Sequence, residues 1–218
     1  MTRLYNKTIR ISEIFYSLQG ETRFAGIPTV FIRLTGCPLR CHYCDTEYAF
    51  TGGSLLSIEH IISKVNQYNT KYITVTGGEP LAQDNTTDLL DCLVAAHYTV
   101  SLETSGAIDI SSLNPKVIKI MDLKTPASGE QSKNRYSNIR YLNPCDEVKF
   151  VICNDDDYHW AKQIIHQYQL NERCNILFSP STPQYSPRHL AEQILNDQLA
   201  VRFQIQLHKI LWDDARGR

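Results

Sequence analysis

Two hydrophobic patterns alternate along most of this chain. Runs rich in β-branched apolar residues, typical of strands, occupy 29–36, 72–78, 99–106, 117–124, 147–153, 175–181 and 202–211. Apolar residues spaced three and four positions apart predict helices over 54–68, 86–97, 155–169 and 187–199. In the first of these helices Leu55, Ile58, Ile61, Ile62 and Val65 would share one buried face.

Strands that alternate with helices predict parallel pairing, with each helix crossing from one strand to the next. A complete barrel of eight such units needs about 250 residues, whereas this chain has 218. The crossover between 106 and 117 carries no helical pattern, and 126–138 is loop-like. We therefore expect an α/β fold, an incomplete TIM-type β/α barrel of mostly parallel strands, forming one domain over residues 1–218.

Composition narrows the class of protein. The chain is 42% hydrophobic and 21% charged with a net charge of −1, which is typical of a globular protein without a dominant nucleic-acid surface. No apolar run approaches the roughly 18 residues that a membrane span needs. The N-terminal segment lacks the continuous apolar stretch of a secretory signal. We expect a cytoplasmic protein, whose cysteines stay reduced.

Three of the seven cysteines fall close together, in the segment GCPLRCHYCDT. Cys37, Cys41 and Cys44 are separated by three and then two residues, and the polar residues between them argue against simple packing. A structural zinc ion normally has four ligands, and no second cysteine pair follows, so a stray residue would have to complete the site. An iron–sulfur cubane usually takes four cysteines, so three would leave one iron open to a substrate or cofactor.

Glycines and polar residues follow the predicted strands. These segments are 35–37, 76–80, 103–106, 122–124, 179–181 and 206–209. In β/α barrels the C-terminal ends of the strands form the rim of the active site, and glycine there lets a ligand approach the backbone closely. Each segment alone is compatible with an ordinary turn. Because several such segments follow strands beside the loop that carries Cys37, Cys41 and Cys44 (the cysteine loop), the sequence predicts an active site at this rim.

With these residues placed, the chain resembles the radical S-adenosylmethionine (SAM) superfamily, in which the open iron binds SAM and one electron cleaves it. The resemblance implies that Cys37, Cys41 and Cys44 hold a [4Fe-4S] cluster. Tyr43 would contact the adenine, and the segment TGGEP the amino group of SAM. The full set of implied SAM contacts is Tyr43, Gly77, Gly78, Glu79, Glu103, Ser105, Asp122 and Lys124.

The segments EIFYSLQGE, FIRLTGCPLRCHYCDT, TGGEP, ETSG and QLHKILW together resemble the 7-carboxy-7-deazaguanine synthase family. Members contract the ring of 6-carboxy-5,6,7,8-tetrahydropterin to 7-carboxy-7-deazaguanine and release ammonia, on the pathway to the tRNA base queuosine. The resemblance implies Mg²⁺ at Thr46, a position that sequence alone would assign to a helix cap. The implied substrate contacts are Leu18, Gln19, Gly20, Glu21, Arg33, Thr76 and His208.

The residue types suit such a substrate. Arg33 stands among the apolar residues of the first predicted strand, and its guanidinium could clamp the substrate carboxylate in a bidentate pair. Glu21 would accept hydrogen bonds from the aminopyrimidinone edge. For His208, a structural hydrogen bond is the simpler interpretation.

The resemblance also implies a small pterin substrate, an electron donor such as flavodoxin and a homodimer, with no direct contact to nucleic acid or a membrane. An activase of glycyl-radical enzymes is an alternative, because it shares the cysteine loop and a short barrel. That enzyme would need a large protein partner. It would need neither residues 18–21 (the LQGE segment) nor a clamp at Arg33. A second alternative is a zinc-stabilised binding module without catalytic activity, which would be colourless where a cluster protein is brown.

Overall fold

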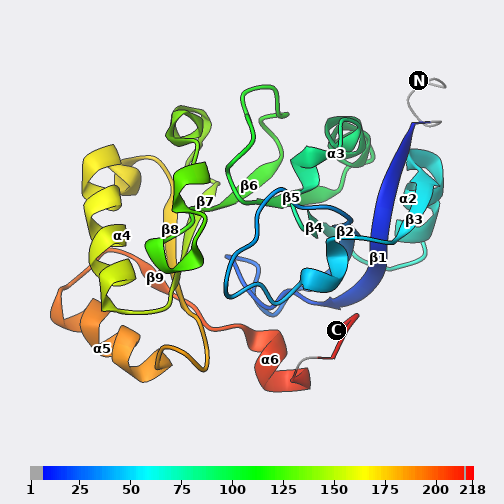
Figure 1. The fold of residues 1–218 in the computed structure, drawn as a ribbon. Helices are drawn as coiled ribbons and strands as arrows, with labels where there is room; N and C mark the ends of the chain where they lie inside the picture. Colours follow the sequence, from blue (N-terminus) through cyan, green and yellow to red (C-terminus); the bar gives the residue numbers. More distant parts are fainter. Residues whose placement is uncertain (1–6, 214) are drawn as a thin grey trace.

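The β-branched runs pair into one curved, open sheet with the order β3-β1-β2-β4-β5-β6-β7-β8-β9 (Figure 1). The computed structural model describes residues 7–213 and 215–218. The strands within them are β1 (Thr8–Leu18), β2 (Pro28–Leu34), β3 (Ser54–Ser57), β4 (Tyr72–Gly77), β5 (Thr99–Thr104), β6 (Ile118–Asp122), β7 (Glu147–Ile152), β8 (Asn175–Pro180) and β9 (Arg202–Phe203). From β2 to β9 all neighbours pair in parallel, whereas β1 runs antiparallel to β2 and β3. The expected α/β architecture, an incomplete barrel of mostly parallel strands, is confirmed.

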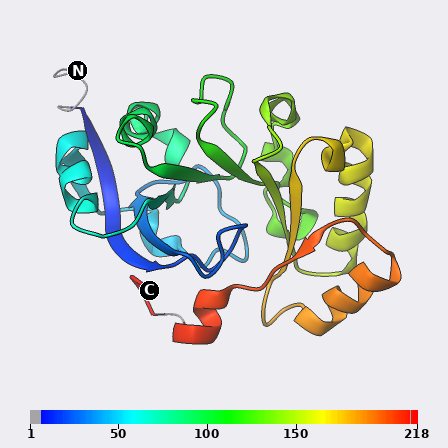
Figure 2. The ribbon, with the colours of Figure 1, turned by 180° about the vertical axis from the view of Figure 1, so that it is seen from behind.

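Helices cover the outer face of this sheet, two toward each end (Figure 2). They are α2 (Ile58–Val65), α3 (Thr86–Ala95), α4 (Asp155–Tyr168) and α5 (Pro187–Asn196), while α6 (Leu207–Trp212) lies across the opening of the barrel. One buried apolar cluster includes Ile32 of β2 and Leu89 of α3. A second includes Phe150, Tyr158 and Phe178, from β7, α4 and β8. Because burial of apolar surface drives packing, both clusters fix the helices against the convex side and leave the concave side to loops.

The segment 54–57, predicted as the start of a helix, is instead strand β3. It pairs with β1, a strand that the prediction lacked, so that Leu55 lies opposite Arg10. Leu55 is 58% exposed and does not share the buried face of the helix. The helix begins at Ile58, where Ser57 accepts a hydrogen bond from the His60 backbone N–H as N-cap. The hydrogen bonds of β1 therefore override the local helical pattern.

The last predicted strand, 202–211, is also wrong beyond its first two residues. Only Arg202–Phe203 pairs with β8, and Leu207–Trp212 is helical. The backbone N–H of Leu207 donates to the carbonyl of Gly20 at 3.0 Å. Because this contact with the LQGE segment lies away from the sheet, the chain leaves β9 and turns toward the opening of the barrel.

The remaining connections are short. The crossover from β5 to β6 contains no helix, as expected, and 126–138 contains only single turns. The 3₁₀ helices are η1 (Glu47–Ala49), η2 (Pro80–Ala82), η3 (Pro126–Ser128), η4 (Gln131–Lys133), η5 (Tyr136–Tyr141) and η6 (Leu170–Glu172). The expected domain, 1–218, includes residues 1–6 and 214, which lie outside the described residues. No helix in the described part of the chain is long and apolar enough to cross a membrane.

Candidate active site

The carboxyl ends of the parallel strands open onto one cavity of about 570 Å³. Loops after β2, β4, β5, β6 and β8 meet there with the LQGE segment and α6. All of the site residues predicted from the sequence line this cavity except Glu79: Leu18, Gln19, Gly20, Glu21, Arg33, Cys37, Cys41, Tyr43, Cys44, Thr46, Thr76, Gly77, Gly78, Glu103, Ser105, Asp122, Lys124 and His208. Parallel pairing brings these distant segments to one edge of the sheet.

The cysteine loop connects β2 to η1 along one wall of the cavity. Cys37, Cys41 and Cys44 are all partly buried, free thiols on the cavity wall. Burial raises the pKa of each thiol, that of Cys41 to about 11, although the Lys124 ammonium acts in the opposite direction. Thiolate ligands must be deprotonated, so metal binding here would release protons.

The three thiols suit a cluster better than a single metal ion. Within the described residues, no three Cys, His, Asp or Glu side chains converge as one zinc ion would require. In a cubane each cysteine binds a different iron, so the three sulfur atoms stand apart around a larger group. This donor set, three thiols and no fourth, fits a cluster with one open iron.

Gly78 packs directly against the cysteine loop. A Cβ atom at Gly78 would collide with the Gly36 carbonyl oxygen and would lie 2.6 Å from the Cys37 Cβ. The Glu79 backbone N–H donates to the same Gly36 carbonyl at 2.9 Å. Glycine is therefore required at position 78 because the backbone of the cysteine loop occupies the space of a side chain.

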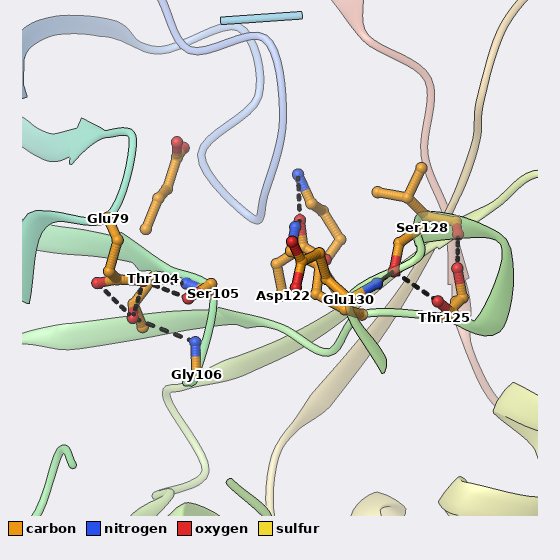
Figure 3. A network of polar contacts seen from close by, with 12 residues as sticks. Glu79, Thr104, Ser105, Gly106, Asp122, Thr125, Ser128 and Glu130 are labelled. Carbon is orange, nitrogen blue, oxygen red and sulfur yellow. Dashed lines mark hydrogen bonds and ion pairs between the residues drawn. The ribbon is translucent and has the colours of Figure 1, made fainter. Parts of the chain in front are cut away.

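Glu79 lies behind the cavity wall, where it is fully buried. Its carboxylate accepts hydrogen bonds from the Leu81 N–H at 3.0 Å, the Ser105 N–H at 2.7 Å and the Thr104 hydroxyl at 2.9 Å (Figure 3). Hydrogen bonds to a buried charge are strong. In this structure Glu79 thus ties the end of β5 to the loop after β4, and holds Ser105 on the cavity.

Asp122 stands at the end of β6 (Figure 3). It forms an ion pair with Lys124, with 2.8 Å between Oδ2 and Nζ. Burial lowers the pKa of Lys124, but the Asp122 carboxylate raises it above its usual range. Within the described residues, Asp122 Oδ1 and the Tyr43 hydroxyl are buried without a hydrogen-bond partner. Leaving such groups unpaired costs about 1–3 kcal/mol each. Two orphaned polar atoms at predicted SAM contacts suit a polar ligand.

Glu103 stands at the centre of a polar floor. Its carboxylate accepts from the Thr76 hydroxyl at 2.8 Å and from the Gln19 side-chain amide at 3.4 Å. Burial raises the pKa of Glu103, and the Lys149 ammonium partly offsets this. The floor therefore combines hydrogen-bond donors and acceptors in a buried site, where an unpaired charge has a large free-energy cost.

The Arg33 side chain is 17% exposed and already has a partner. Its Nε donates to Glu13 Oε1 at 2.8 Å, and the Tyr48 hydroxyl donates to the same oxygen at 2.7 Å. The guanidinium carbon lies 5.8 Å from the centre of the Phe15 ring and 5.9 Å from that of Tyr48. These contacts fix the plane of the guanidinium, and its two terminal nitrogens donate to no described residue on this wall of the cavity.

The LQGE segment and α6 are packed against each other. A Cβ atom at Gly20 would collide with the His208 ring, so this glycine admits the imidazole. Thr46 is the N-cap residue of η1, as the helix-cap interpretation expects, but its side chain makes no cap hydrogen bond to η1. Its hydroxyl instead donates to Asp45 Oδ1 at 2.8 Å. Asp45 Oδ2 in turn accepts from the Gln206 amide at 3.2 Å, which links the cysteine loop to the last helix.

Sequence reasoning missed several cations that line the cavity, Lys149 and Arg216 among them. Lys149 of β7 pairs with Glu21, at 2.7 Å between Nζ and Oε2. A charge between the apolar residues Val148 and Phe150 is the same signal that singled out Arg33, and it could have found Lys149. Arg216, near the C-terminus, stacks 4.0 Å from the centre of the Tyr48 ring, and its sequence context gives no such signal.

Comparison with known proteins decides the family. Residues 31–122 match the model of the radical SAM superfamily. The chain is 44% identical to the 7-carboxy-7-deazaguanine synthase of Chlorobaculum tepidum, across 96% of this chain and 97% of that protein. The chain belongs to the 7-carboxy-7-deazaguanine synthase family. A second member of the family, from Koribacter versatilis, is 40% identical across 94% of this chain and 97% of its own length.

A solved structure shares the fold of this chain. QueE from Escherichia coli matches this chain with a TM-score of 0.76 at 23% identity, covering 92% of this chain and 95% of that one. Membership of the radical SAM superfamily makes SAM and a [4Fe-4S] cluster the cofactors of this enzyme. The individual contacts of the site residues remain predictions.

Proposed function

We propose that this enzyme contracts the ring of 6-carboxy-5,6,7,8-tetrahydropterin to 7-carboxy-7-deazaguanine, with release of ammonia. The family of the chain supports this reaction. The observation that carries the proposal at the level of residues is one cavity that joins three thiols to a fixed guanidinium and a row of carboxylates. A carboxylated, nitrogen-rich bicycle needs a cation at one end and hydrogen-bond acceptors at the other.

Each end of the cavity has its own task in this proposal. Cys37, Cys41 and Cys44 hold the cluster, which together with SAM supplies a 5′-deoxyadenosyl radical when both are bound. Asp122 Oδ1 and the Tyr43 hydroxyl gain partners from SAM, which explains why the protein leaves these buried atoms unpaired. Glu79 holds Ser105 in place at the SAM site.

The substrate lies between the LQGE segment and Arg33. The two terminal nitrogens of Arg33 clamp the carboxylate, since Glu13 occupies only the Nε edge. Gln19 and Glu21 face the aminopyrimidinone edge, and Thr76 lies beneath the ring to be contracted, where its hydroxyl donates to Glu103 on the side of SAM. Buried, fixed groups of this kind orient a substrate more precisely than exposed ones.

Mg²⁺ completes the proposed cofactor set. The Thr46 hydroxyl faces the cavity, and the neighbouring Asp45 carboxylate gives this corner a negative charge. Magnesium prefers oxygen ligands and often takes few of them from the protein, with substrate and water completing its shell. Thr46 would therefore hold the ion together with the substrate.

The proposal extends to the cellular setting. Cluster thiolates require a reducing compartment, so we place the enzyme in the cytoplasm. A reduced carrier such as flavodoxin supplies the electron, and the working unit is a homodimer of single-domain subunits that binds neither nucleic acid nor membrane. The near-neutral net charge of −1 is compatible with this assignment.

Anaerobic turnover tests the function. The reconstituted enzyme is supplied with SAM, a reductant, Mg²⁺ and 6-carboxytetrahydropterin, and the product is identified by mass spectrometry. We expect 7-carboxy-7-deazaguanine together with ammonia. Transfer of a glycyl radical to a protein without pterin turnover would favour the activase, and a colourless zinc protein would favour the binding module.

A further inference from the structure

Lys149 is a buried cation whose role the proposed reaction leaves open. It belongs to β7, where Val148 and Phe150 are fully buried in the apolar cluster on the outer side of the sheet. Because side chains alternate along a strand, Lys149 points the other way, into the cavity. Its side chain is 15% exposed. Burial lowers the pKa of Lys149, but three carboxylates, led by that of Glu21, raise it above its usual range, so the ammonium stays charged.

The contacts of this ammonium leave part of it available. Lys149 Nζ donates to Glu21 Oε2 at 2.7 Å and lies 3.9 Å from Asp122 Oδ2. An ammonium carries three N–H donors, and within the described residues only the bond to Glu21 is formed. Glu21 in turn uses Oε2 for Lys149, and its Oε1 accepts no hydrogen bond from any described residue. The pair therefore presents a donor beside an acceptor on the wall of the cavity.

A donor beside an acceptor is the complement of a cyclic amide, which presents a carbonyl oxygen beside an N–H. The pyrimidinone ring of a pterin has this edge, formed by the C4 carbonyl and N3–H. We propose that Lys149 selects the 4-oxo form of the substrate by donating to the C4 carbonyl while Glu21 accepts from N3–H. This inference rests on the proposed function, because it assumes a pterin bound against the LQGE segment.

A 4-amino pteridine offers the opposite pattern. Its exocyclic amine points N–H donors at the ammonium, and its N3 carries a lone pair that faces the Glu21 carboxylate. Both contacts then fail together. Sites built to hydrogen-bond a substrate group discriminate strongly against analogues that leave buried polar groups unpaired. Lys149 would thus determine specificity for oxo over amino substituents at this position.

A purely structural role for Lys149 makes a different prediction. The ammonium could do no more than neutralise Glu21, Glu103 and Asp122. Its removal would then weaken every ligand of the cavity by a similar factor. The ratio of affinities for the 4-oxo and 4-amino compounds therefore separates the two roles.

The experiment compares wild type, Lys149→Met and a matched control. Lys119→Met is the control, since Lys119 forms a buried pair with Asp146, at 2.9 Å, that lies outside the cavity. The probes are 6-carboxytetrahydropterin and its 2,4-diamino counterpart, with dissociation constants measured anaerobically in the presence of SAM. Release of 5′-deoxyadenosine without pterin reports that the fold, the cluster and SAM binding are intact.

We expect wild type to bind the 4-oxo compound at least about 30-fold more tightly than the 4-amino compound, as loss of a charged hydrogen bond implies. Lys149→Met should bind the 4-oxo compound about 10- to 100-fold more weakly, with the 4-amino compound changed less than about threefold. The ratio then collapses, whereas Lys119→Met keeps it. A ratio that Lys149→Met leaves intact would overturn the inference.

If Lys149→Met fails to fold, Lys149→Gln replaces it, because glutamine retains an N–H donor without the charge and should keep part of the discrimination. Complete loss of the discrimination in Lys149→Gln would also support the inference, and an unchanged ratio would overturn it. Equal binding of both compounds by wild type refutes the role of Lys149 without any variant. Absence of pterin turnover in wild type would refute the proposed function, whereas turnover with an unchanged ratio refutes the role of Lys149 alone.

Discussion

Replacement of Arg33 by Ala tests the carboxylate clamp. The guanidinium is only 17% exposed and is oriented by Glu13, Phe15 and Tyr48, so its pairing with a substrate carboxylate would be screened little by water. A charge-assisted bidentate contact of this kind contributes roughly 2–3 kcal/mol. At about 1.4 kcal/mol per tenfold, kcat/KM should fall about 30- to 150-fold. Arg33→Lys should recover little, because an ammonium lacks the planar fork.

The ion pair with Glu13 sharpens this test. In Arg33→Ala the Glu13 carboxylate loses its cation and faces the substrate carboxylate, which adds repulsion to the lost contact. The double variant Arg33→Ala/Glu13→Gln should therefore recover about three- to tenfold of the lost kcat/KM. If Arg33 acted only by stabilising the fold, the double variant would show no such recovery of kcat/KM.

The assay pairs product formation with 5′-deoxyadenosine release in the absence of pterin. The second rate should survive in all three variants, because the cluster and SAM depend on other residues. Arg135→Ala serves as a control, since Arg135 also forms an ion pair, but at an exposed site outside the cavity. The distance between its Nη2 and Asp109 Oδ2 is 2.7 Å. Near-normal kcat/KM in Arg33→Ala would refute the clamp.

Three further predictions concern the cysteine loop. Cys37→Ala, Cys41→Ala or Cys44→Ala should each abolish the iron–sulfur absorbance, whereas Cys92→Ala, at a buried position of α3, should cost only about 1 kcal/mol of stability; a Cys92 variant without the cluster would contradict this. Gly78→Val should lower cluster content as well as SAM affinity, because the added side chain displaces the loop at Gly36; iron analysis equal to wild type would argue against that packing. In the apoprotein, alkylation of Cys41 followed by peptide mass spectrometry should accelerate about tenfold per pH unit between pH 7 and 9, since its pKa of about 11 keeps the thiolate scarce; a plateau near pH 8 would show a lower pKa.

Several features of the site were set by local sequence. The cysteine spacing needs only a short loop, and the glycines and polar residues that follow β2, β4, β5 and β6 stand where parallel strands end. The alternation of β-branched runs with helical patterns predicts the barrel, because each pattern has its own period and its own buried face. These signals depend on neighbours in the chain, so a reader of the sequence can find them.

Other features depend on partners far away in the chain. Residues 54–57 carry a helical pattern but become a strand because β1 offers backbone hydrogen bonds, and 206–212 leaves the sheet because the LQGE segment lies beside it. The pairing of Lys149 with Glu21 joins positions 128 residues apart. Glu79 has the sequence context of a ligand contact, yet its charge is satisfied behind the wall by β5. Periodicity does not show which charges will be buried together, and only the tertiary fold decides how each of them is neutralised.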